Sequence, residues 1–101
     1  MGNNGNALRR LVLSREQKDV LRRVAVEKFG TRENFAQALE SAAGRRRYGN
    51  LYLFSVNYER HLQGQPVTKR FAQIYLDALG DDSRLEFLRP VVGNGVNGLS
   101  N

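Results

Sequence analysis

Apolar residues recur at spacings of three and four through most of the chain, and this period predicts helices rather than strands. The first apolar run starts after Ser14, a residue type that caps helices, and stops at Gly30. The second run starts after Thr31 and stops at Gly44. We therefore expect one helix over about 15–29 and a second between Thr31 and Gly44.

The stretch from Gly44 to Gly64 fits two periods. As a helix capped by Asn50, it places four apolar residues on one face, namely Leu51, Phe54, Tyr58 and Leu62. As a strand, it alternates through Tyr52, Phe54, Val56 and Tyr58, and residues 45–50 then form a hairpin with it. We favour the helix because its period continues to Leu62 and ends at Gly64.

Two further helices are expected after Pro66. The first is capped by Thr68 and ends at Gly80. The last is short, is capped by Asp82 or Ser83, and is stopped by Pro90. The predicted fold is therefore all-α, a compact bundle of about five short helices, with an extended loop or a small hairpin near 44–50.

The two ends of the chain differ in composition from the centre. Gly and Asn dominate residues 2–6 and 93–98, and such segments offer little apolar surface to bury. We expect a flexible basic N-terminal arm over 1–13, one domain over 14–90, and a flexible tail over 91–101.

Composition excludes several classes of function. The 101 residues include no Cys and one His, so thiol chemistry and a His-based metal cluster have no ligands to use. The only general-base arrangement available combines His61 with Glu59 or Asp77. We expect no enzyme activity, no cofactor or metal and no small-molecule substrate. No apolar run approaches the roughly 20 residues that span a bilayer, so we expect a cytoplasmic protein without a membrane partner.

The net charge of +6 is concentrated in the middle of the chain. Residues 44–65 hold four Arg against one Glu, a net +3, and three of these arginines are the run Arg45, Arg46 and Arg47. Clustered arginines beside aromatic residues are typical of contact with nucleic-acid phosphates and bases.

The order of several residues resembles one family. From FAQAL at 35–39, through Gly49, to NYER at 57–60 and FAQIYLDALG at 71–80, the chain resembles the lambda-repressor-like helix-turn-helix proteins of the Cro and Xre type. The resemblance covers roughly residues 15–89. It implies a DNA-binding domain of phage or bacterial type that acts as a transcriptional regulator or repressor, with its recognition helix after Gly49.

One departure from the family adds charge. Gly49 follows Ala36 at a greater distance than the family's turn glycine does, so residues are inserted between the two motif helices. The insertion contains Arg45–Arg47 and Tyr48, and we interpret it as a loop or hairpin that meets the DNA backbone.

The expected contacts follow from the outward face of the proposed recognition helix, because successive residues turn by about 100°. The residues expected to read bases are Tyr52, Leu53, Val56, Asn57, Arg60 and Gln63. The residues expected to bind phosphates are Arg45, Arg46, Arg47, Lys69, Arg70, Arg9 and Arg10. Arg9 and Arg10 belong to an arm that can enter a minor groove.

The expected partner is double-stranded DNA, bound by a monomer or by a homodimer formed through Leu85–Leu88 or the tail. Two alternatives stay open. Leu53 and Val56 can instead pack against the preceding helix or a second subunit, or serve with Tyr52 as anchors of an antitoxin-like or inhibitor-like interaction module. Tyr48 and Tyr52 can instead stack on unpaired RNA bases.

Overall fold

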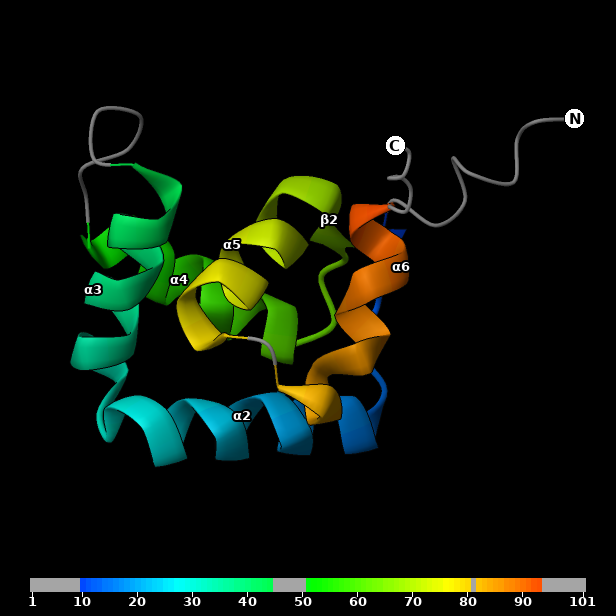
Figure 1. Ribbon diagram of the computed structural model, residues 1–101, viewed down its shortest axis with the longest axis horizontal. Helices are drawn as coiled ribbons and strands as arrows, with labels where there is room; N and C mark the ends of the chain where they lie inside the picture. Colours follow the sequence, from blue (N-terminus) through cyan, green and yellow to red (C-terminus); the bar gives the residue numbers. More distant parts are fainter. Residues whose placement is uncertain (1–9, 45–50, 81, 94–101) are drawn as a thin grey trace, which may run out of the picture.

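Helices make up most of the described chain. The computed structural model describes residues 10–44, 51–80 and 82–93. In chain order the elements are β1 (Arg10–Leu11), α2 (Arg15–Phe29), α3 (Arg32–Ala43), α4 (Leu51–Leu62), β2 (Val67–Thr68), α5 (Lys69–Leu79), the 3₁₀-helix η1 (Ser83–Leu88) and α6 (Arg89–Val92) (Figure 1). The predicted all-α fold is confirmed, with one pair of very short strands added to it.

The predicted capping residues begin three of the helices. Ser14 and Gln17 form a reciprocal capping box at the start of α2, with side chain–backbone hydrogen bonds of 3.1 and 2.9 Å. Thr31 and Thr68 each accept a hydrogen bond from the backbone N–H three residues later, at the starts of α3 and α5. These local signals explain why the three helices begin where the sequence predicts.

The segment with two possible periods is helical. α4 covers Leu51–Leu62, and Phe54 and Tyr58 from its predicted inner face are buried. The strand interpretation of this segment is therefore wrong. Residues 45–50, which include the expected loop or hairpin and the Asn50 cap, lie outside the described part of the chain.

Aromatic side chains join α3, α4 and α5. The ring of Phe35 on α3 meets the edge of Tyr58 on α4 at 4.9 Å and stacks with Tyr75 on α5 at 6.2 Å. Phe54 on α4 and Phe71 on α5 have ring centroids 6.0 Å apart. Such pairs add about 0.5–1.5 kcal/mol each beyond the burial of their area. The positions of α3 and α4, which run in different directions in Figure 1, are thus set by one core.

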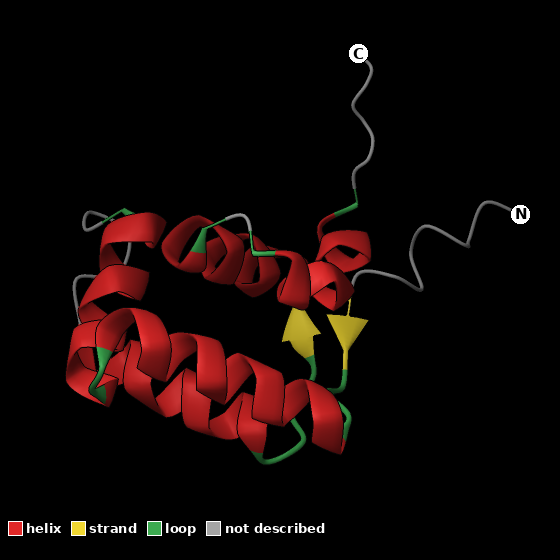
Figure 2. Ribbon diagram, turned by 60° about the horizontal axis from the view of Figure 1, so that its bottom comes forward, coloured by secondary structure: helices red, strands yellow, loops and turns green. Residues whose placement is uncertain are grey.

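A strand pair ties the N-terminal segment to the helices. β1 pairs antiparallel with β2, so Arg10 lies opposite Thr68 and Leu11 opposite Val67 (Figure 2). Leu13, only 3% exposed, joins the hydrophobic core. The expected flexible arm over 1–13 is therefore corrected: residues 10–13 belong to the folded domain, whereas residues 1–9 lie outside the described part.

Pro90 does not stop the last helix. Asp82 caps η1, as expected, but Pro90 occupies the first turn of a following helix, α6. Proline is tolerated there because the N–H that it lacks has no partner within the helix. Val91 is buried, so the packed domain extends beyond the expected boundary at residue 90.

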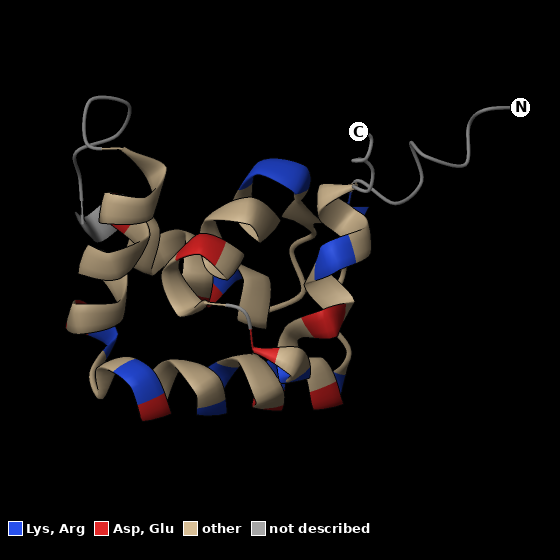
Figure 3. Ribbon diagram, viewed as in Figure 1, with Lys and Arg blue, Asp and Glu red and all other residues tan. Residues whose placement is uncertain are grey.

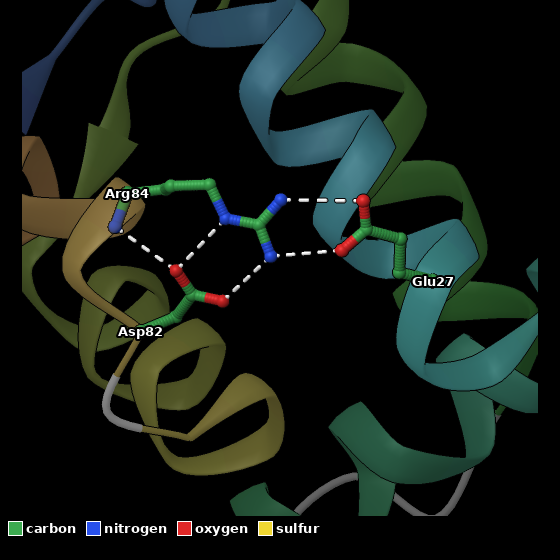
Figure 4. Close-up of polar contacts among 3 residues, drawn as sticks. All are labelled: Glu27, Asp82 and Arg84. Carbon is green, nitrogen blue, oxygen red and sulfur yellow. Dashed lines mark hydrogen bonds and ion pairs between the residues drawn. The ribbon is translucent and has the colours of Figure 1, made fainter.

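Arg84 connects the C-terminal segment to α2. Its Nη1 and Nη2 donate to the two carboxylate oxygens of Glu27, at 3.3 and 2.8 Å. Its Nε and Nη2 also donate to Asp82, at 3.0 and 2.9 Å (Figure 4). Hydrogen bonds from Arg84 lower the pKa of both carboxyls, that of Asp82 to about 2. This three-residue cluster fixes η1 against α2.

Candidate nucleic-acid interface

α4 has one buried face and one face toward solvent. Phe54, Tyr58 and His61 recur at spacings of four and three, and all three are buried. Arg60, which lies away from this face, is exposed, and so is Gln63 in the turn directly after α4. The core therefore holds α4 so that its polar side stays accessible.

The residues expected to read bases differ in how far the structure leaves them exposed. Arg60 and Gln63 are exposed, as a contact residue must be. Val56 and Asn57 are half-buried, and Asn57 has an interaction within the protein. The side chains of Tyr52 and Leu53 lie outside the described part of the structure, although the backbone of both is helical. Four expected reading residues are thus wholly or partly accessible, three of them on α4 and Gln63 in the turn directly after it.

An ion pair binds α4 to the start of α3. Arg32 Nη1 lies 2.7 Å from Glu59 Oε1, and the Arg32 guanidinium carbon lies 5.9 Å from the centre of the Tyr58 ring. Glu59 and Arg60 are the only Asp, Glu, Lys or Arg residues of α4. Because Arg32 balances Glu59, the remaining charge of α4 is the cation Arg60.

His61 is a buried polar residue of the core. It is 4% exposed, and its Nδ1 forms a 2.6 Å hydrogen bond with Tyr75 Oη. Its ring also meets the edge of Phe71 at 4.9 Å. Burial lowers the pKa of His61 from 6.5 to about 4 and raises that of Tyr75 well above 10.0, so both groups are neutral near pH 7.

The general-base arrangement considered for His61 is not assembled. Glu59 pairs with Arg32, while Asp77 accepts a 2.8 Å hydrogen bond from Gln73. The imidazole instead bonds to Tyr75 inside the core. His61 is thus a packing residue that holds α4 against α5.

The pairing of β1 with β2 brings three of the expected phosphate-binding residues to one part of the molecule. Arg10 is directly opposite Thr68, both are exposed, and opposed residues of a strand pair project from the same face. Lys69 and Arg70 follow Thr68 at the start of α5 and are also exposed. The fold therefore brings Arg10 to the edge of the molecule where α5 begins. Arg9 and Arg45–Arg47 lie outside the described residues.

The pairing of β1 with β2 could not be predicted from the sequence, because it is a contact between distant segments. The strand pair joins Arg10 to Thr68 and Leu11 to Val67, and each strand has two residues, too few for an alternating pattern to be seen. Leu11, Val12 and Leu13 are all apolar, so the sequence does not show that both leucines contact the core while Val12 is 57% exposed.

In the described part of the chain, no group of three or more His, Cys, Asp or Glu side chains is placed to hold a metal ion. The described helices also include none with the length and apolar character needed to cross a bilayer. No family model, curated protein or solved structure matches the chain.

Proposed function

We propose that this protein binds double-stranded DNA in a sequence-specific manner, with α3 and α4 as a helix-turn-helix unit and α4 in the major groove. By its resemblance to lambda-repressor-like proteins, it acts as a transcriptional regulator of phage or bacterial type. The observation that carries the proposal is the division of α4 into an aromatic face held by α3 and α5 and an accessible side that presents Arg60, with the exposed Gln63 in the turn that follows.

The chemistry of that face suits base edges. Arg60 can donate two hydrogen bonds to guanine, and Gln63 or Asn57 can pair with adenine. Each good bidentate contact discriminates against a wrong base by about 1–3 kcal/mol. Glu59 would repel phosphate, but Arg32 lies 2.7 Å from it and offsets its charge.

The cations at the start of α5 support the same proposal. Lys69 and Arg70 stand in the first turn, where positive charge opposes the helix macrodipole. A phosphate at this position would interact favourably with both side chains and with the helix N-terminus. The register of β1 adds Arg10 to the same edge, so three cations from two segments lie where the backbone of a duplex would meet them.

The first experiment is a selection of bound sequences from a random duplex pool, followed by titration of the selected and a scrambled duplex at several salt concentrations. Sequence-specific binding predicts an enriched motif and an affinity that falls steeply with salt. Titration of single-stranded RNA in parallel decides the RNA alternative, and binding to no nucleic acid leaves the protein-interaction alternative. The absence of any enriched motif would overturn the proposal.

Substitutions then distinguish residues that contact bases from residues that contact phosphates. Arg60→Ala should lower affinity for the selected duplex by roughly 5- to 150-fold and reduce the preference over the scrambled duplex. Arg46→Ala should weaken both duplexes alike and lower the salt slope by about one. Arg23→Ala, which removes an exposed arginine from α2, is the matched control. Equal effects of Arg60→Ala and Arg46→Ala on both duplexes would show that the recognition face is misassigned.

A further inference from the structure

An open groove lies where α3 ends, α5 begins and α6 ends. Its volume is about 470 Å³, and its lining comes from all three helices. The three helix ends lie along one edge of the molecule, at the top in Figure 1. The first turn of α5 supplies Lys and Arg to this edge (Figure 3). The volume falls within the range typical of sites for small molecules, about 300–1,000 Å³.

The groove has an apolar lining of mostly small side chains. Ala42 and Ala43 come from the last turn of α3, Ile74 from α5 and Val92 from α6. Ala42, Ala43 and Val92 are each half-buried, so part of their apolar surface faces the opening. Because an alanine ends at its methyl group, the two residues of α3 leave room that larger side chains would fill.

The polar groups lie at different points along the groove. Lys69 and Arg70 line it at the start of α5, and both are exposed. Gln73 and Asp77 line it further along α5, joined by a 2.8 Å hydrogen bond. Lys69 and Asp77 are eight residues apart, a rise of about 12 Å. The groove thus has a cationic end, an apolar wall and a distal carboxylate that already accepts a hydrogen bond.

We propose that this groove binds a small amphipathic anion, an aliphatic or aromatic carboxylate, with its carboxylate at Lys69 and Arg70. Its apolar body lies over Ala42, Ala43 and Val92. Charge complementarity selects an anion over a neutral amphiphile, and Asp77 at the far end disfavours a second negative charge there. The ligand site does not rest on the proposed DNA binding. Where DNA phosphates use Lys69 and Arg70, the ligand competes with them.

Three probes of graded chemistry test the site on the full chain. Octanoate has both an anionic and an apolar part, 1-octanol lacks the charge, and acetate lacks the apolar body. Backbone amide chemical shifts, followed during titration, locate each probe. We expect octanoate to shift Ala42, Ala43, Gln73 and Val92 with a dissociation constant on the order of 1 mM, and the other two probes to bind at least several-fold more weakly.

Two variants and one control assign the roles. Lys69→Gln should weaken octanoate roughly fivefold and leave 1-octanol unchanged, because only the anion uses that charge. Lys28→Gln makes the same change on α2, away from the groove, and should have no effect. Ala43→Leu should block octanoate and 1-octanol by filling the groove. Circular dichroism checks that the helices persist in this variant.

Three outcomes would overturn the ligand site. These are shifts spread over the surface instead of the groove, equal shifts from octanoate and acetate, and equal weakening by Lys69→Gln and Lys28→Gln. None of these outcomes depends on DNA. Failure of the ligand site and failure of the proposed DNA binding are therefore separate results.

Discussion

The buried His61 should make the domain lose stability when the pH falls from 7 to 5. Burial lowers the pKa of this imidazole from 6.5 to about 4. Between these two pH values, the imidazole is therefore protonated in the unfolded chain and neutral in the folded protein. Stability is therefore full above pH 6.5 and declines as the pH falls toward 4. Linkage gives a loss of about 2 kcal/mol between pH 7 and 5, and about 3 kcal/mol once both states are protonated.

Between pH 7 and 5, the effect of His61 on stability can be separated from that of the carboxyl groups. Asp82 and Glu27 have lowered pKa values, Asp82 about 2, so the stability that they contribute is lost only at more acidic pH. Urea unfolding at pH 5, 6 and 7, followed by far-UV circular dichroism, measures the effect. The helices supply the signal, since the chain has no Trp.

Two substitutions separate burial from hydrogen bonding as the cause. His61→Asn removes the titrating group and keeps a polar atom near the position of Nδ1, so its stability should be lower but nearly independent of pH in this window. Tyr75→Phe should cost about 1–3 kcal/mol because it leaves the imidazole nitrogen without its partner, yet it should retain the pH slope. Equal slopes for the wild-type protein and His61→Asn, or an imidazole that titrates near 6.5 in the folded protein by NMR, would refute the reasoning.

Three further predictions concern stability. Leu13→Ala should cost about 2–4 kcal/mol in urea unfolding because Leu13 is 3% exposed, whereas Val12→Ala, at a site 57% exposed, should stay within about 0.5 kcal/mol. Equal costs would show that Leu13 does not pack in the core as described. Thr68→Ala should cost about 1 kcal/mol in the same assay by removing the cap of α5, and no loss would mean that the cap is not formed. Arg84→Ala should lower the thermal midpoint at low salt, and the difference should shrink at high salt, since it breaks the charge pairs with Glu27 and Asp82. A difference unchanged by salt would assign Arg84 a packing role instead.

The helices that could be predicted from sequence are those with local signals. α2 begins with a capping box and α5 with a capping threonine, and these hydrogen bonds form within three residues of the cap. The segment that forms α4 also fitted a strand. The helix could still be predicted, because the apolar period continued to Leu62, further than an ordinary strand runs.

The rest of the fold depends on contacts between distant segments. Arg84 meets Glu27 across 57 residues, and no spacing rule connects them. Pro90 was expected to end a helix, but a proline fits a helix's first turn as well as the position after its end, and sequence alone does not distinguish the two.

The candidate interface could be predicted only in part. The outward face of α4 followed from its helical period, and Arg60 on α4 and Gln63 in the turn after it are exposed. His61 completes the inner stripe with Phe54 and Tyr58, but an apolar pattern omits a polar residue. Its burial becomes visible only once Tyr75 is placed against it, at 2.6 Å.

The cations at the start of α5 connect the two proposals. Lys69 and Arg70 oppose the dipole of their own helix, and the strand register adds Arg10 to the same edge. An anion bound at this edge would interact favourably with these cations. A duplex phosphate and a small carboxylate can both supply that anion. If both bind, octanoate should weaken DNA binding in the wild-type protein and should do so less in Lys69→Gln, whereas Lys28→Gln should keep the full competition. Undiminished competition in Lys69→Gln would mean that the two anions do not share this edge.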